Sequence, residues 1–150
     1  MDDRLAPLEA LMRASRVITA VVAGSLARNE DVVTMPQMRV LVLVASRADV
    51  GASAVAASLG IHLSSASRIC ERLVAAGLLT RREAPADRRQ IELGLTAAGS
   101  ELIASIMDDR RAAFAAMLRG MSAEDRVALT SGLVALADVA GEPPEPLLLP

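Results

Sequence analysis

Two adjacent stretches decide the fold of this chain. Residues 53–77 read SAVAASLGIHLSSASRICERLVAAG, and residues 78–95 read LLTRREAPADRRQIELGL. In the first stretch, Gly60 separates two short runs of helical character, and Gly77 closes the second run. Glycine commonly ends a helix because it adopts the left-handed conformation without strain. The first stretch therefore predicts a helix-turn-helix, two short helices joined by a tight turn.

The bounds of the two helices follow from their caps and spacing. We expect the first helix over residues 54–59 with Ser53 as its N-cap, and the second over residues 64–76 after a turn at 61–63. The second helix carries an apolar stripe at helical spacing, formed by Ala66, Ile69, Cys70, Leu73 and Val74.

The second stretch predicts a β-hairpin. Residues 78–82 favour a strand, and residues 83–88 contain Pro85 and Asp87, which are typical of a loop. Residues 90–95 then alternate, with Ile91, Leu93 and Leu95 on one face. A hairpin directly after a helix-turn-helix predicts a winged helix-turn-helix, so the fold class is mainly α with a small β-hairpin wing.

Longer helices flank this region. They are expected over residues 5–28, over residues 35–48 after the N-cap Thr34, over residues 97–119 after the cap Thr96, and over residues 123–140 after Ser122, with Asp125 in the reciprocal capping position. The first of these helices is apolar nearly all round in its second half, which requires burial on more than one side. Residues 141–150 contain four prolines and cannot form a regular helix.

Missing residue types exclude several kinds of active site. The chain has no lysine, tryptophan or tyrosine, and it has one histidine, His62, and one cysteine, Cys70. A lysine Schiff base and a P-loop are therefore impossible, and a zinc site of several histidines and cysteines cannot be built within one chain. We expect a protein that is not an enzyme and that uses no cofactor or metal.

Hydropathy and length place the chain in a broad class. At 150 residues with 53% hydrophobic residues, it can bury the core of a single domain spanning residues 1–150. The uninterrupted apolar runs, such as residues 40–45, are much shorter than the ~20 residues of a membrane span. The N-terminus has no apolar signal core, so we expect a cytoplasmic protein without membrane attachment.

Charge is distributed unevenly along the chain. The net charge is −2, but residues 60–91 hold six arginines and three acidic residues, a net charge of +3, so the remainder carries −5. A basic middle in an acidic chain is typical of a nucleic-acid-binding face, although an ordinary solvated face has the same composition.

The order of these features resembles that of the MarR (multiple antibiotic resistance regulator) family of bacterial transcription factors. The resemblance covers roughly residues 34–120, and its parts are Thr34-x-x-Gln37, the helix-turn-helix, Gly77-Leu78-Leu79-x-Arg81, Asp87-Arg88-Arg89 and Leu95-Thr96-x-x-Gly99. It implies a homodimeric DNA-binding regulator, more often a repressor than an activator. Residues 34–96 would be the DNA-binding region, and residues 1–32 and 97–140 would be dimerisation helices, although their apolar residues are also compatible with packing within one chain.

The partner implied by the resemblance is double-stranded DNA with a palindromic operator. The second helix of the pair enters the major groove through its N-terminal residues, and Arg68 is the best candidate to read a guanine. The other candidate DNA contacts are Ser53, Ser64, Ser65, Ser67, Arg72, Arg81 and Arg82. The serines also suit helix capping, and Arg72 suits an internal ion pair. One of Arg81 and Arg82 should face the DNA and the other the domain, but the alternation does not say which.

The wing loop supplies the remaining candidates. In relatives that this chain resembles, an aspartate orients the second of two basic residues into the minor groove. Carried over, Asp87 holds Arg89 in a narrow groove of enhanced negative potential, and Arg88 contacts a phosphate. The alternative is an ordinary exposed ion pair.

Three further interpretations remain open. Cys70 lies in register with the apolar stripe and is better explained as a buried small hydrophobe than as a redox sensor. His62 is better explained as a solvated turn residue than as a phosphate contact or pH sensor. The family implies a small-molecule effector, and an apolar anion could meet Met12, Arg16, Met35, Met38, Arg39, Met107 and Arg110, unless these are packing and surface residues.

Two other functions compete with the regulator interpretation. A winged-helix domain used only for protein–protein contacts would keep the fold without a specific operator, and would tolerate changes at Arg68 or Arg89. An enzyme is the weaker alternative, because one histidine and one cysteine without lysine or tyrosine offer few catalytic groups.

Overall fold

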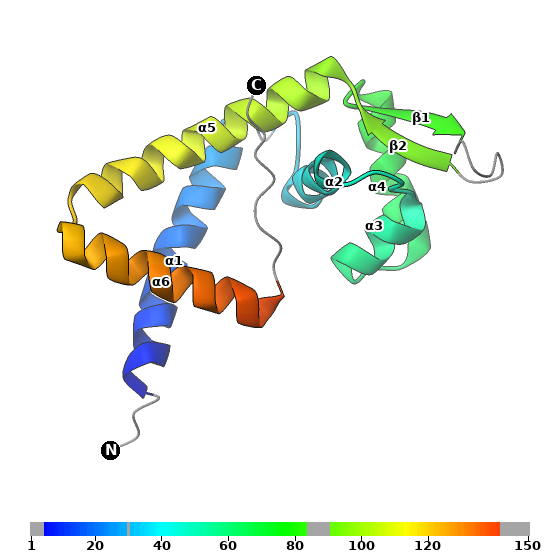
Figure 1. Cartoon of the computed structure of the whole chain (residues 1–150). Coiled ribbons are helices and arrows are strands. Elements are labelled where there is room, and N and C mark those ends of the chain that lie inside the picture. Colours follow the sequence, from blue (N-terminus) through cyan, green and yellow to red (C-terminus); the bar gives the residue numbers. More distant parts are fainter. Residues whose placement is uncertain (1–4, 30, 84–90, 142–150) are drawn as a thin grey trace. The chain divides into compact units, whose positions relative to one another are not determined.

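The computed structural model describes residues 5–29, 31–83 and 91–141. Its elements follow the order that the sequence predicts, mainly helical with one antiparallel hairpin (Figure 1). They are α1 (Leu5–Ala27), α2 (Met35–Ser46), α3 (Ala52–Leu59), α4 (Leu63–Ala75), β1 (Leu79–Glu83), β2 (Ile91–Leu95), α5 (Ala97–Arg119) and α6 (Ala123–Ala140). The predicted fold class is confirmed.

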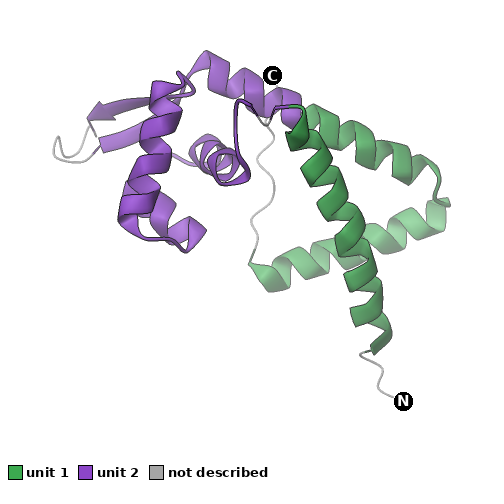
Figure 2. Ribbon diagram, turned by 180° about the vertical axis from the view of Figure 1, so that it is seen from behind, with its two compact units in different colours: residues 1–28, 107–147 green, residues 29–106, 148–150 purple. Residues whose placement is uncertain are grey.

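The chain divides into two compact units, coloured separately in Figure 2. Unit 1 combines α1 and α6 with the part of α5 that begins at Met107. Unit 2 contains α2, α3, α4, the hairpin and the first part of α5, up to Ile106. Unit 2 therefore holds the whole predicted winged helix-turn-helix.

Unit 2 has a true hydrophobic core. α3 packs against α4, and α2 packs against both helices and against β2. The most completely buried side chains include residues of α2, α3, α4 and β1, namely Met38, Val40, Leu41, Val55, Ala66, Cys70, Leu73 and Leu79. Ala66, Cys70 and Leu73 belong to the stripe predicted on α4, while Ile69 and Val74 lie at its half-exposed margin.

Helix α2 begins with the predicted cap. The Gln37 side-chain oxygen accepts hydrogen bonds from the backbone N–H of Thr34 at 2.8 Å and from its hydroxyl at 3.0 Å. The helix ends at Ser46 rather than near residue 48, because Arg47 is already extended and Asp49 has a φ of 61°. This left-handed residue turns the chain toward Val50, which is buried.

The hairpin is tied to the helix pair by its backbone. β1 and β2 pair in antiparallel register, with Arg81 opposite Leu93 and Arg82 opposite Glu92. On its other side, β2 donates from the N–H of Leu93 to the carbonyl of Val50 at 2.8 Å. This bond anchors the hairpin to the residue that precedes α3.

A second anchor joins the start of β1 to the start of α5. The Thr96 hydroxyl donates to the carbonyl of Gly77 at 2.7 Å and accepts from the N–H of Gly99 at 2.9 Å, as expected for the N-cap of α5. The N–H of Thr96 donates to the carbonyl of Leu78 at 3.2 Å. These contacts explain the threonine of the Leu-Thr-x-x-Gly motif, and its glycine is explained by the carbonyl oxygen of Leu78, which a Cβ at position 99 would overlap.

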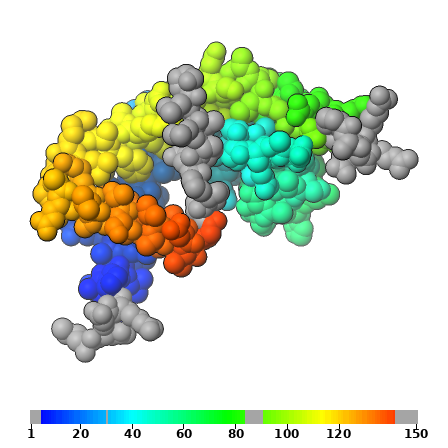
Figure 3. Space-filling model, viewed as in Figure 1, coloured from blue at the N-terminus to red at the C-terminus, as the bar shows by residue number. Residues whose placement is uncertain are grey.

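Unit 1 buries far less than unit 2. Among its described residues, only Ser25, Leu26 and Met107 are buried. Helix α6 has no buried residue, and in Figure 3 it lies at the surface along its visible length in orange. Its start is nevertheless well defined, because the Ser122 hydroxyl accepts from the N–H of Asp125 at 3.0 Å, as the sequence predicts.

Helix α1 has the length and composition of a helix able to cross a membrane. Uninterrupted apolar runs did not indicate this, because polar residues such as Glu9, Arg13, Arg16 and Thr19 interrupt the runs while the average hydropathy of the helix stays high. A helix that is buried in an oligomer has the same apolar character.

Candidate nucleic-acid interface

The N-terminal turn of α4 presents two serine side chains at the surface. The helix begins at Leu63 with His62 as its N-cap, so the expectation that Ser64 begins or caps this helix is wrong. The carbonyl of His62 accepts from the N–H groups of Ser65 and Ala66, both at 3.0 Å. Ser64 and Ser65 are exposed, which leaves both hydroxyls accessible to an incoming partner.

Helix α3 also begins earlier than expected. Its N-cap is Gly51, so Ser53 is an exposed residue inside the first turn and not the cap. The cause is the hairpin, which holds Val50 by a backbone bond and passes so close that a Cβ on Gly51 would lie 2.9 Å from the carbonyl oxygen of Ile91. The helix therefore starts directly after this contact, as soon as the backbone is free to turn.

Two arginines on α4 carry uncompensated charge. Arg68 and Arg72 are both exposed, and neither forms an ion pair with any residue that the structure describes. Four residues apart, they lie on neighbouring turns of one helix face. Ser67, one residue before Arg68, is half-buried. This face of α4 offers hydroxyl groups at its start and positive charge along its length.

The two arginines of β1 are paired, each with a glutamate of another element. Arg82 donates from Nε to Oε2 of Glu92 at 3.1 Å, across the hairpin. Arg81 Nη2 lies 3.8 Å from Oε1 of Glu71 on α4. Adjacent strand residues face opposite sides of a sheet, so the two pairs lie on opposite faces of the hairpin.

The burial of Glu92 differs from what the alternation of β2 indicates. Ile91, Leu93 and Leu95 were expected on one face of the strand, and such an apolar set is typical of a buried face, but Ile91 is half exposed while Glu92 is only 6% exposed. Sequence reasoning missed Glu92 as a site residue. The feature that identifies Glu92 is its position directly across the hairpin from Arg82. This cross-strand register can be assigned only once the length of the hairpin loop is known.

The wing tip lies outside the described residues. Asp87, Arg88 and Arg89 fall within residues 84–90, so the predicted contact of Asp87 with Arg89 stays a prediction. The described part of the hairpin shows only where this loop leaves and rejoins the domain, after Glu83 and before Ile91.

A cavity of about 270 Å³ lies between α4 and the hairpin. Its walls are Ala52, Ser67, Cys70, Glu71, Arg81, Ile91 and Leu93. Cys70, within α4, is 1% exposed. Its burial raises the pKa of the thiol, and the positive charge of Arg81 opposes this effect. A protonated, buried thiol is a poor nucleophile, which agrees with a packing role.

Unit 1 contains a second, smaller cavity of about 200 Å³. It is lined by Ile18, Val22, Met107, Arg110, Arg111 and Phe114. Of the seven residues that the sequence suggested for contact with an effector, Met107 and Arg110 line this cavity. Of the others, Met12 and Arg16 are exposed on α1, Met35 and Arg39 are exposed on α2, and Met38 is buried in the core of unit 2.

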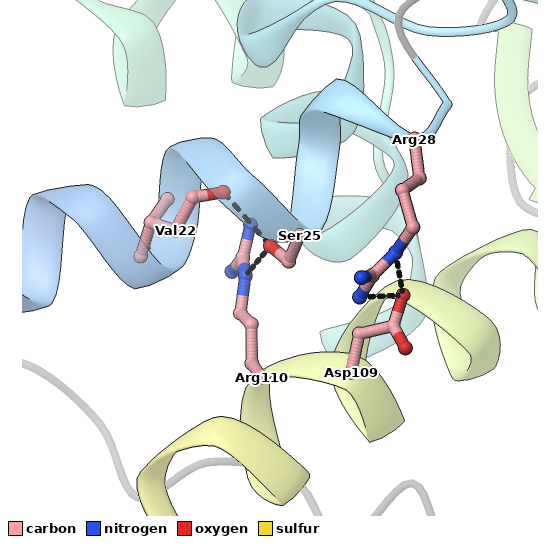
Figure 4. A network of polar contacts seen from close by, with 5 residues as sticks. All are labelled: Val22, Ser25, Arg28, Asp109 and Arg110. Carbon is pink, nitrogen blue, oxygen red and sulfur yellow. Dashed lines mark hydrogen bonds and ion pairs between the residues drawn. The ribbon is translucent and has the colours of Figure 1, made fainter.

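Polar contacts link α1 to α5 beside this cavity (Figure 4). Arg110 donates from Nε to the Ser25 hydroxyl at 2.8 Å, and this hydroxyl donates to the carbonyl of Val22 at 2.8 Å. Arg28, the residue directly after α1, forms an ion pair with Asp109, with Nη2 and Oδ2 2.6 Å apart. The guanidinium of Arg110 is therefore held at the cavity by a buried serine.

Comparisons with known proteins agree with this geometry. The sequence model of the MarR family matches residues 33–90. YfiV of Bacillus subtilis, described as an uncharacterized HTH-type transcriptional regulator, is 27% identical over 104 residues, which are 69% of this chain and 65% of YfiV. This match thus spans a little less than two thirds of YfiV.

Two solved structures extend the comparison to nearly the whole chain. Rv1404 of Mycobacterium tuberculosis is 30% identical, with a TM-score of 0.84 and coverage of 96% of this chain and 98% of that one. FabT of Streptococcus pneumoniae, solved in complex with DNA, is 19% identical, with a TM-score of 0.73 and coverage of 94% and 99%. The second likeness shows a shared fold.

Proposed function

This chain belongs to the MarR family of transcriptional regulators, and we propose that it acts as a homodimer that occupies a palindromic DNA operator and represses transcription there. Membership of the family points to a DNA-binding protein and not to an enzyme. Regulation of a promoter would place the protein in the cytoplasm. Residues 34–96 would bind DNA, while the helices within residues 1–32 and 97–140 would form the dimer, together making one functional domain.

The observation that carries the proposal is the exposed face of α4. Arg68 and Arg72 have no charge partner among the described residues, and the hydroxyls of Ser64 and Ser65 stand at the start of the same helix. A helix with this arrangement suits the major groove, where its first residues meet base edges and its cations meet phosphates. The likeness to FabT, which was solved with DNA, supports the same use of the fold.

The proposed homodimer accounts for the surface of unit 1. Among the described residues of this unit, fourteen large apolar side chains are exposed in the single chain, such as Leu8 on α1 and Val127 and Val139 on α6. Apolar surface of this extent is unfavourable in water and is typical of an interface. A second copy of the chain would cover it, and a twofold axis would then present two α4 helices to a palindrome with half-sites about one turn of DNA (~34 Å) apart.

The direct test is a binding titration with the DNA upstream of the protein's own gene, across a salt series, beside a scrambled duplex. We expect tight binding to the native duplex by two chains, with a log–log salt slope on the order of −7 for about four phosphate contacts per subunit. Light scattering after size exclusion reports the mass of the free protein. Concentrations must come from peptide absorbance, because the chain lacks tryptophan and tyrosine.

Three outcomes would contradict parts of the proposal. A monomeric protein would remove the homodimer. Equal weak binding to both duplexes would show that the DNA upstream of the protein's own gene is not its operator. The operator would then have to lie elsewhere in the genome. No binding even at low salt would favour a winged-helix module for protein contacts.

We further propose that the unit 1 cavity takes an effector that relieves repression, namely a small apolar carboxylate. Ile18, Val22, Met107 and Phe114 provide apolar walls, and Arg110 provides a guanidinium that is held in place by Ser25. A planar guanidinium recognises a carboxylate through two parallel hydrogen bonds. An anion there would act on DNA binding only if it bound the free and DNA-bound states differently.

Benzoate serves as the probe for this cavity. We expect millimolar benzoate to raise the melting temperature of the wild-type protein and to weaken operator binding, and to do neither in Arg110→Met, because the carboxylate loses its partner. Arg13→Met, on the exposed part of α1, removes a charge elsewhere and serves as the control. Equal responses of Arg110→Met and the wild type would show that benzoate acts elsewhere, and no response of the wild type would remove this ligand class.

A further inference from the structure

Adjacent arginines on β1 differ in how firmly they are held. We propose that Arg81 is the strand arginine that contacts the DNA backbone, that Glu71 competes with DNA for it and thereby lowers the affinity for DNA of any sequence, and that Arg82 holds the hairpin together. The inference rests on the proposed DNA-binding function and assigns separate roles to two residues that the sequence does not distinguish.

Arg82 is committed to the hairpin by its partner. The Glu92 side chain is 8% exposed, and Arg82, whose own side chain is 61% exposed, donates to it from Nε at 3.1 Å. No other cation among the described residues pairs with Glu92, and a largely buried carboxylate that loses its cation partner is destabilised. Moving Arg82 to a phosphate would impose this cost, so Arg82 stays on Glu92.

Arg81 is held loosely. Its Nη2 atom lies 3.8 Å from Glu71, too far for a hydrogen bond, and the two side chains are 43% and 62% exposed. Exposed ion pairs of this kind contribute little to stability, since water screens both charges. A phosphate can therefore replace the Glu71 carboxylate at small cost.

The position of Glu71 means that replacing its carboxylate by a DNA phosphate at Arg81 affects the affinity for DNA. Glu71 lies on α4, three residues after Arg68, and it borders the same cavity as Ser67 and Arg81. Its carboxylate repels phosphates and attracts Arg81, so it weakens binding to every DNA sequence. Every duplex bears this penalty, so Glu71 lowers the affinity for DNA without changing the ratio of specific to non-specific affinity.

The first experiment compares Arg81→Gln with Arg82→Gln, using the salt dependence of operator binding and the melting temperature. For Arg81→Gln we expect the log–log slope to become shallower by about 2 in the dimer, with an unchanged melting temperature, because one phosphate contact per subunit is lost. For Arg82→Gln we expect a lower melting temperature and an unchanged slope. Arg119→Gln, an exposed change in unit 1, controls for net charge.

The second experiment measures binding of Glu71→Gln to a scrambled duplex and to the operator. We expect the affinity for the scrambled duplex to rise about tenfold in the dimer, which corresponds to removing one like charge per subunit a few ångströms from a phosphate. The operator should gain by a similar factor, because the same repulsion is removed for both duplexes. Glu9→Gln, an exposed change on α1, is the matched control.

Each of the following outcomes would contradict a different claim of the proposal. A shallower slope in Arg82→Gln but not in Arg81→Gln would reverse the assignment of the two arginines. A scrambled-duplex affinity of Glu71→Gln equal to that of Glu9→Gln would remove the competition. A wild-type protein that binds neither duplex would instead overturn the proposed function, because the variants are compared only through DNA binding.

Discussion

Arg68→Gln is expected to weaken operator binding by about 100-fold or more, while the melting temperature stays unchanged. A bidentate contact between arginine and guanine is worth about 1–3 kcal/mol, and a homodimer loses it twice. Arg68 is exposed and has no ion-pair partner among the described residues, so its replacement leaves no orphaned charge in the protein. Fluorescence anisotropy with a labelled duplex measures the loss.

The control separates base reading from charge. Arg119→Gln removes the same charge from the last turn of α5 and should bind the operator nearly as the wild type does. If Arg68→Gln matched this control, Arg68 would not contact DNA. If instead it lost affinity equally for the operator and for a scrambled duplex, Arg68 would be a phosphate contact and not a base reader.

Gly99→Ala is expected to destabilise the protein by about 3 kcal/mol or more, which lowers the melting temperature by roughly 10 °C. A Cβ on Gly99 would lie 2.2 Å from the carbonyl oxygen of Leu78. That oxygen is backbone, and it also accepts from the N–H of Thr96, so it cannot move without opening the junction between β1 and α5. Thermal unfolding followed by circular dichroism measures the effect.

Helix propensity alone predicts the opposite sign for this change. Alanine is favoured over glycine inside a helix by about 1 kcal/mol, so the clash must exceed that gain. Gly132→Ala in α6, where a Cβ meets no atom within 4 Å, is the matched control and should not lower the melting temperature. A melting temperature of Gly99→Ala at or above the wild-type value would show that the junction tolerates a methyl group.

Most of the fold followed from local signals in the sequence. The left-handed glycines at Gly60 and Gly77, the caps at Thr34, Thr96 and Ser122, and the helical spacing of apolar residues predicted the observed order of helices and strands. Such signals are reliable because they act within one turn or one strand. The errors, at the starts of α3 and α4 and the end of α2, were of one or two residues.

The candidate interface was predicted less completely. Arginine content and position identified Arg68 and Arg72, whose exposure agrees with the expectation. Arg81 and Arg82 could not be told apart, because alternation places neighbours on opposite faces without saying which face meets which partner. Glu71 was missed because its relation to Arg81 joins a helix to a strand.

The sequence by itself determined the winged helix-turn-helix, the order of its helices and strands and the basic character of its middle. Only the tertiary structure decided that Glu92 is buried against Arg82, that Ser53 does not cap α3, and that Gly99 faces the carbonyl of Leu78. The physical reason is separation along the chain. Each of these features depends on hairpin register or on the close approach of a remote backbone segment, and neither is encoded in the residues beside it.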